Sequence, residues 1–158
     1  MRPELLDPLR GNSKLQAATL LAEEIYRLHE AGKDYSNVLS KLIRLSGRVI
    51  GKFDVHSNFG TVDAEAFARD LLIDWDSIPS NLTREEMLEL AAAICEPQRN
   101  QEYLSYWIAC LRVNTGDDRI SDLIYWPGDY FGDGDNKREL SPEEILDTAL
   151  AAGAAQMK

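Results

Sequence analysis

The spacing of the apolar residues constrains the fold of this chain more than any other feature. Along most of its 158 residues they recur at three- and four-residue intervals, as on one face of an α-helix. Residues 14–31, 83–95 and 102–113 show this spacing most clearly. Residues 54–63, DVHSNFGTVD, lack it and look irregular. No segment of useful length alternates apolar and polar residues as a half-buried strand does. The sequence therefore predicts an all-α fold.

Capping residues indicate where several of these helices begin. Asp63 precedes an amphipathic segment, and its carboxylate can accept a hydrogen bond from the free N–H groups of a first turn. Thr83 with Glu86 three residues later fits a capping box. Ser141 followed by Pro142 is typical of a helix start, because proline suits the first helical position.

The formal net charge is −10, and the excess is concentrated in the second half. Residues 82–158 carry 7 Lys/Arg against 15 Asp/Glu, whereas residues 1–81 carry 10 against 12. This balance argues against direct nucleic-acid binding, which requires a basic surface. It suits a basic protein partner, although an acidic surface can also serve solubility alone.

The sequence shows no membrane or export signal. No apolar run approaches the roughly 18 residues of a membrane span. The first residues, MRPELLDPLRGN, lack the apolar core of a signal peptide. We therefore expect a cytoplasmic, bacterial-type protein that makes no membrane contact.

Residues that commonly carry chemistry are few and scattered. Cys95 and Cys110 lie in helical patterns beside apolar residues, so we expect two reduced core thiols instead of a disulfide or a metal pair. His29 and His56 have no neighbouring cysteine or serine in a recognisable catalytic motif. The sequence accordingly predicts neither an enzyme nor a bound cofactor, although active sites can assemble from distant residues.

An aspartate-rich segment, residues 129–135, raises the question of a metal site. Counted from Asp133, Glu144 falls at the twelfth position, where an EF-hand loop has its bidentate glutamate. Lys137 and Arg138 occupy the fifth and sixth positions, where that loop requires a ligand and a glycine. The pattern therefore predicts no metal ion.

The segment SDLIYWP, residues 121–127, gathers aromatic and aliphatic residues between carboxylates. We expect a short helix with the serine as its cap and the proline as its end. On so short a helix Asp122, Tyr125 and Trp126 share one face, while the two aliphatic residues between them anchor the helix to its domain. The aromatic pair suits a binding surface. The alternative is that residues 1–80 cover it.

Three motifs resemble the colicin and pyocin nuclease immunity proteins, small four-helix proteins that bind and inhibit bacteriocin DNases. They are LTREEMLELAAAIC, SDLIYWP and LSPEEIL, which occur in the order and approximate spacing of that family. The resemblance covers residues 82–150. It implies an immunity-like four-helix domain over residues 81–158, preceded by a helical region, residues 1–80, of unknown role.

The resemblance also implies which residues bind a partner. The shared binding energy would fall on Asp122, Tyr125 and Trp126, and residues 102–113 would form the partner-selecting helix. The presenting face of that helix would carry Leu104, Ser105, Ile108 and Arg112. Trp126 stands where the family has a second tyrosine, and Arg112 where it commonly has an acidic residue. The target therefore need not be a nuclease of the usual colicin kind.

The implied function is stoichiometric inhibition of a toxin, a bacterial nuclease with a basic surface, through an acidic aromatic face. Inhibition would come from binding, because the acidic surface steers the protein onto a basic enzyme and excludes the nucleic-acid substrate. The alternative is a structural or interaction module with the same fold and no toxin partner.

Overall fold

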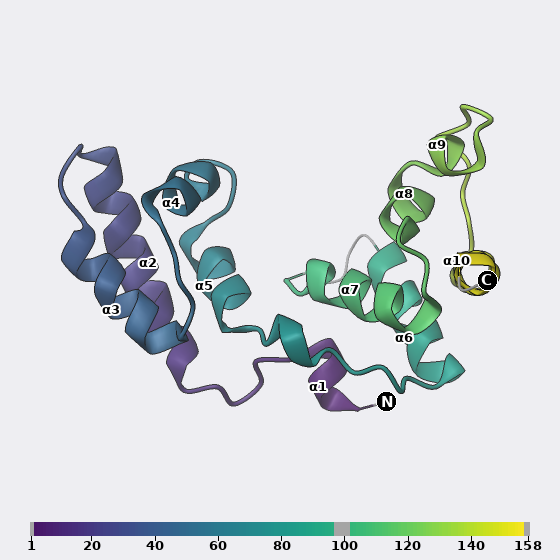
Figure 1. Ribbon diagram of the computed structural model, residues 1–158, viewed down its shortest axis with the longest axis horizontal. Coiled ribbons are helices and arrows are strands. Elements are labelled where there is room, and N and C mark those ends of the chain that lie inside the picture. The colour runs from purple at the N-terminus through teal and green to yellow at the C-terminus, as the bar shows by residue number, and fades with distance from the viewer. Residues whose placement is uncertain (1, 97–101, 157–158) are drawn as a thin grey trace. The chain divides into compact units, whose positions relative to one another are not determined.

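The computed structural model describes residues 2–96 and 102–156, and within them every regular element is a helix (Figure 1). The all-α prediction is therefore confirmed. In chain order the elements are α1 (Pro3–Leu6), α2 (Lys14–Glu30), α3 (Ser36–Ser46), α4 (Lys52–Asn58), α5 (Ala64–Leu72), the 3-10 helix η1 (Trp75–Ser77), α6 (Arg84–Cys95), α7 (Leu104–Thr115), α8 (Ile120–Tyr125), α9 (Pro127–Phe131) and α10 (Pro142–Gln156). None of these helices is long and apolar enough to cross a bilayer.

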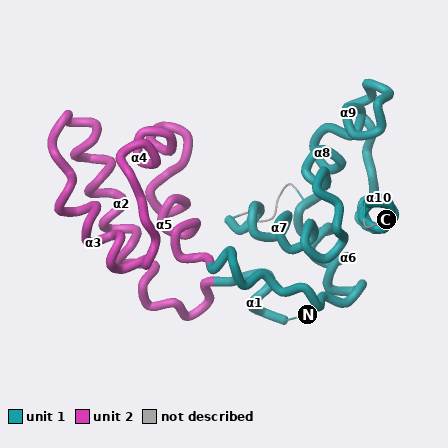
Figure 2. Tube along the Cα trace, in the orientation of Figure 1, with its two compact units in different colours: residues 1–8, 74–158 teal, residues 9–73 magenta. Residues whose placement is uncertain are grey.

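The chain divides into two compact units (Figure 2). Unit 1 consists of residues 1–8 and 74–158, and unit 2 consists of residues 9–73. Unit 2 is thus inserted, in sequence, between α1 and the rest of unit 1. The sequence predicts a boundary at residue 80 and does not predict that the first eight residues pack with the C-terminal part of the chain.

Unit 2 is built on α2, which contacts both α3 and α5. Its core draws buried side chains from these three helices and from α4. Tyr26 of α2 joins two of these elements, because its ring lies 5.5 Å from that of Phe59 and 5.9 Å from that of Phe67. The Tyr26 hydroxyl also donates a hydrogen bond of 3.0 Å to the Val62 carbonyl.

The sequence reading of residues 54–63 as irregular is wrong over its first half, where α4 forms. The carboxylate of Asp54 accepts a 2.7 Å hydrogen bond from the backbone N–H of Gly51 and so holds the first turn. Only Val55 of this helix is buried, so no repeating apolar stripe marks it. The cap at Asp63 is confirmed, because Oδ1 of Asp63 accepts a 2.7 Å hydrogen bond from the Ala66 N–H.

Unit 1 is built around α10, which packs on α6, α7 and α8. The largest fully buried side chains of this unit include Leu90 of α6, Leu111 of α7, Leu123 of α8 and Leu146 of α10. Gly153 of α10 lies directly against the end of α7. A Cβ at this position would overlap the Thr115 carbonyl oxygen, so the close packing of the two helices depends on glycine.

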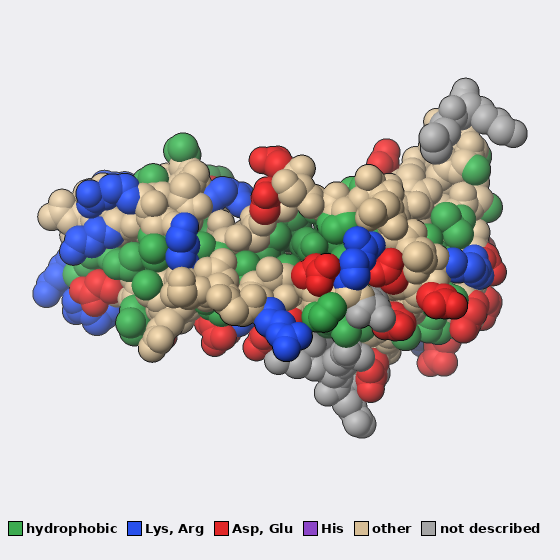
Figure 3. Space-filling view, turned by 90° about the horizontal axis from the view of Figure 1, so that it is seen from below, with side chains coloured by type: hydrophobic (Ala, Val, Ile, Leu, Met, Phe, Trp, Pro, Cys, Tyr) green, Lys and Arg blue, Asp and Glu red, His purple; other side chains and the backbone are tan. Residues whose placement is uncertain are grey.

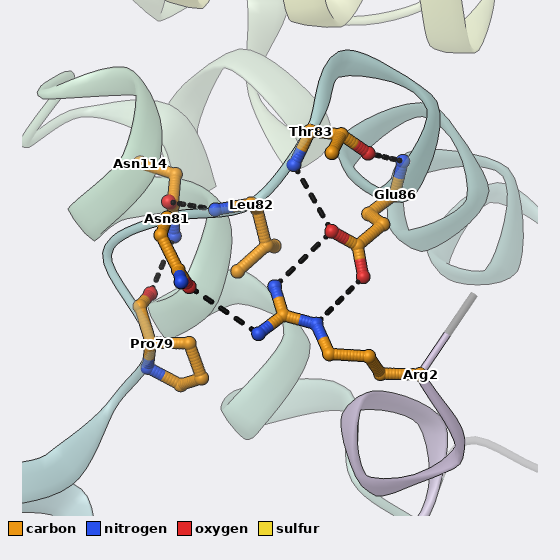
Figure 4. A network of polar contacts seen from close by, with 7 residues as sticks. All are labelled: Arg2, Pro79, Asn81, Leu82, Thr83, Glu86 and Asn114. Carbon is orange, nitrogen blue, oxygen red and sulfur yellow. Dashed lines mark hydrogen bonds and ion pairs between the residues drawn. The ribbon is translucent and has the colours of Figure 1, made fainter.

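The predicted capping box of α6 is confirmed (Figure 4). The Glu86 N–H donates to the Thr83 hydroxyl at 3.1 Å, and the Thr83 N–H donates to the Glu86 carboxylate at 3.0 Å. The same carboxylate accepts two hydrogen bonds from the Arg2 guanidinium, at 2.8 and 3.1 Å. Leu5 of α1 is fully buried. The first residues of the chain are therefore tied to unit 1 by an ion pair and by apolar burial.

A second set of contacts in Figure 4 holds the segment that leads into α6. The Asn114 side chain of α7 accepts a 3.0 Å hydrogen bond from the Leu82 N–H. Its amide donates at 2.7 Å to the carbonyls of Pro79 and Cys110. One side chain thus satisfies backbone groups on both sides of the contact, which fixes the start of α6 against α7.

Candidate partner-binding face

The segment SDLIYWP forms α8, but its boundaries differ from the expected ones. The helix begins at Ile120, so the serine lies inside it and is not the cap. The first turn is supported instead by Asp117, whose Oδ1 accepts a 3.0 Å hydrogen bond from the Arg119 N–H. Pro127 does not only end α8, because it is also the first residue of α9. Proline lacks the N–H that a first helical position leaves free, so the same residue can do both.

The two faces of α8 differ as the sequence predicts. Leu123 is fully buried, whereas the side chains of Tyr125 and Trp126 are 43% and 56% exposed. Asp122 is half-buried on the same side. Burial of part of the Tyr125 side chain raises the pKa of its phenol. We call Asp122, Tyr125 and Trp126 the α8 face.

Asp122 is held in place by Arg119. The Arg119 Nε atom lies 3.4 Å from the Asp122 carboxylate, and both side chains are about half exposed. The Arg119 Nη2 atom also donates a 3.2 Å hydrogen bond to the Asp129 carbonyl, and its guanidinium lies 5.1 Å from the Tyr130 ring centre. A pair this exposed adds little to stability.

A groove with a volume of about 460 Å³ lies beside the α8 face. Tyr125 lines it, together with Cys95 at the end of α6 and Arg138 before α10. Cys95 was expected in the core, but it is exposed because it is the last residue of α6. Cys110 is fully buried, as expected. Burial raises the pKa of the Cys110 thiol to about 11.

The helix that the resemblance assigns to partner selection is α7. Ser105 and Arg112 are exposed, and Leu104 is half-buried. Ile108 was expected on the presenting face, but it is only 8% exposed. It lies on the same stripe as Leu111, which is buried in the core, so little of its side chain is accessible to a partner. The accessible part of α7 is therefore smaller than the sequence suggests.

The aspartates after Pro127 make contacts within their own segment. Asp133 forms an ion pair with Arg138, and its Oδ1 accepts a 2.9 Å hydrogen bond from the Asp135 N–H. The hydrogen bond from Asp135, followed by the charge of Arg138, lowers the pKa of Asp133. Within the described parts of the chain, no three His, Cys, Asp or Glu side chains are grouped so that they could hold a metal ion.

Two exposed apolar residues lie outside the set to which the sequence points. Phe131 of α9 is 41% exposed, and Val113 of α7 is 47% exposed. No helical period marks the segment around Phe131. The signals that could have found α9 are the proline at its first position and Gly132 directly after its last residue.

Unit 1 holds the excess negative charge. It carries 8 Lys/Arg against 19 Asp/Glu, a net charge of −11, whereas unit 2 carries 9 against 8, a net charge of +1. Figure 3 shows Lys and Arg side chains gathered over unit 2 and many Asp and Glu side chains over unit 1. The unit that bears the α8 face is therefore the one suited to a basic partner.

Comparison with known proteins identifies one family. The sequence model of the family described as colicin immunity protein / pyocin immunity protein matches residues 79–151, which lie entirely within unit 1. No curated protein and no solved structure matches the chain.

Proposed function

We propose that this chain binds and inhibits a bacterial toxin, namely a nuclease bacteriocin or a related effector, because residues 79–151 match the model of the colicin and pyocin immunity protein family. The α8 face is the proposed contact. Its two aromatic side chains are 43% and 56% exposed on a helix whose opposite side is buried through Leu123. This exposure is the observation that carries the proposal, since aromatic residues left open on an anchored helix are typical of binding hot spots.

The proposed mechanism is binding without chemistry. The net charge of −11 on unit 1 steers it toward a basic surface such as the one a nuclease uses for nucleic acid. Tyr125 and Trp126 then supply the apolar contact, and Asp122 pairs with a basic group of the toxin. The bound inhibitor excludes the nucleic-acid substrate. On this account the chain is an inhibitor in the cytoplasm and has no catalytic role.

Partner choice is assigned to the exposed part of α7. Ser105 and Arg112 are accessible there, and Leu104 is partly accessible. Arg112 brings a positive charge to a unit that is otherwise acidic, so it favours a toxin with an acidic group or a carbonyl opposite this position.

The test is protection of a growing bacterial culture. The first step is to find a nuclease-toxin gene beside the gene of this protein. That toxin is then induced in cells that also express wild-type protein, the double variant Tyr125→Ala/Trp126→Ala, or the control Phe53→Ala. Phe53 belongs to α4 in unit 2 and is 79% exposed, so its loss alters an exposed aromatic residue outside the α8 face. We expect wild type and the control to protect and the double variant to fail.

Two outcomes contradict the proposal. If wild-type protein gives no protection, the chain is not the inhibitor of that toxin, and a structural or interaction module becomes the better account. If the double variant protects as well as wild type, inhibition does not pass through the α8 face. Equal expression of the three proteins, checked by immunoblot, is required for either conclusion.

A further inference from the structure

The short helix α9 is joined to α8 by an unbroken series of ring and charge contacts. The Arg119 guanidinium lies 5.1 Å from the centre of the Tyr130 ring. The Tyr130 ring meets the Phe131 ring edge to face at 5.1 Å, and the Arg138 guanidinium lies 4.6 Å from the Phe131 ring centre. Asp122 pairs with Arg119 at one end of the series. We call Arg119, Tyr130, Phe131 and Arg138 the stacked series.

The stacked series is anchored to the interior of unit 1 by one hydroxyl group. The Tyr130 Oη atom donates a 2.8 Å hydrogen bond to the Asp117 carboxylate, which is fully buried. The other carboxylate oxygen accepts from the Arg119 N–H. Burial, together with this hydrogen bond, raises the pKa of Tyr130 to about 12, so the phenol stays protonated and keeps donating at physiological pH.

The backbone after α9 is folded tightly onto its start. The N–H groups of Asp133 and Gly134 both donate 3.1 Å hydrogen bonds to the Gly128 carbonyl. A Cβ at Gly128 would overlap the backbone of Asp135, so only glycine permits this approach. The turn and the stacked series together hold Phe131 in a defined position, although 41% of its side chain is exposed.

Two observations connect Phe131 to the α8 face. Arg138, whose guanidinium covers the Phe131 ring, lines the same groove as Tyr125. Trp126 directly precedes α9, and its carbonyl accepts 3.0 Å hydrogen bonds from the N–H groups of Asp129 and Tyr130. Exposed Phe131 is therefore linked to the α8 face through Arg138 and through the backbone of α9.

We propose that α9 forms a second partner-contact surface, in which Phe131 makes the apolar contact and Tyr130 is the positioning residue that holds it beside the α8 face. The occupant is the toxin of the proposed function, on which this inference rests. Asp129 lies two residues before Phe131, whereas Asp133, two residues after it, is paired with Arg138, which also covers the Phe131 ring. The net charge of −11 on unit 1 as a whole therefore decides the complementary toxin surface, which is an apolar side chain in basic surroundings. The contact made by α9 would therefore help to select the partner, together with the exposed part of α7.

The test measures binding of the toxin encoded by the neighbouring gene, with its active site inactivated, to four full-length proteins by calorimetry. They are wild type, Phe131→Ala, Tyr130→Phe and the control Phe53→Ala. We expect Phe131→Ala to weaken binding by about tenfold, as a partly exposed apolar contact does. Its melting temperature should match that of wild type. Phe53→Ala should bind like wild type, because Phe53 belongs to unit 2.

Tyr130→Phe separates positioning from contact, because it removes the hydroxyl that reaches Asp117 and keeps the ring under Arg119. In hydrogen exchange, we expect residues 127–138 of this variant to exchange faster in the free protein, and its complex to dissociate faster. In wild type, toxin binding should slow exchange in the same segment. That measurement needs no variant, so it is independent of any effect of Phe131→Ala on folding.

The outcomes distinguish this inference from the proposed function. If wild type binds the toxin but Phe131→Ala matches Phe53→Ala and residues 127–138 gain no protection, α9 is not a contact surface. The proposed function then stands on the α8 face alone. If wild type does not bind, the proposed function fails and this inference fails with it.

Discussion

The attachment of α1 to unit 1 can be tested with one substitution, Leu5→Ala. Leu5 is fully buried, and it belongs to unit 1 although the 65 residues of unit 2 separate the first eight residues from the rest of unit 1. Replacing a buried leucine by alanine removes its transfer free energy and leaves a cavity, which together cost about 2–5 kcal/mol. Because α1 has only four residues and can partly close the cavity, we expect a loss of about 2–3 kcal/mol in the free energy of unfolding of unit 1.

The three tryptophans make the assay specific for this unit. Trp75, Trp107 and Trp126 all belong to unit 1, so their fluorescence follows its unfolding. For a domain of this size, 2–3 kcal/mol lowers the melting temperature by roughly 10–20 °C. Leu20→Ala is the matched control, because Leu20 lies in α2 of unit 2 and is 59% exposed. If the two variants unfold at the same temperature by tryptophan fluorescence, Leu5 is not part of the core of unit 1.

Three further predictions concern charged residues. Arg2 lowers the pKa of Glu86 to about 2 in the folded protein, below the ordinary value of 4.5. The carboxylate therefore stabilises the fold fully above about pH 5, and this contribution is lost as the pH falls toward 2. In urea titrations over that pH range, the free energy of unfolding of Glu86→Gln should fall less than that of wild type. Equal losses would contradict the Arg2 contact. Arg112→Glu should change which toxins bind while leaving the melting temperature unchanged, because the side chain is exposed. If the variant and wild type bind a panel of toxins with the same Kd values, α7 does not select the partner. Asp129→Asn with Asp135→Asn should slow association at low salt by stopped-flow, with little change in dissociation; an effect only on dissociation would argue against steering.

The start of each of three helices could be predicted because the interactions that fix it are local. The caps at Asp63, Thr83 and Ser141 each join residues three positions apart, and all three form. The burial of Leu123 beneath exposed Tyr125 and Trp126 follows from helical spacing in the same way. Many local interactions are therefore visible in the sequence, although the predicted serine cap of α8 shows that a cap pattern alone does not fix where a helix begins.

Contacts between distant residues were missed, because no spacing rule reports them. The Arg2–Glu86 ion pair joins residues 84 positions apart, so the place of α1 in unit 1 could not be predicted. The burial of Ile108 depends on how α7 is rotated against its neighbours. The helix α9 was missed for a different reason. Pro127 was interpreted only as the end of α8, although it is also the first residue of α9.

The proposed function requires that the α8 face supply most of the binding energy for the toxin. This can be measured by calorimetric titration of the toxin from the neighbouring gene with wild type, Tyr125→Ala and Trp126→Ala at two salt concentrations. We predict a 1:1 complex. Each substitution should cost about 2 kcal/mol or more, which is roughly a 30-fold increase in Kd, and wild-type binding should weaken at high salt. If both variants bind as tightly as wild type, the likeness to immunity proteins is one of fold alone, and inhibition through this face is wrong.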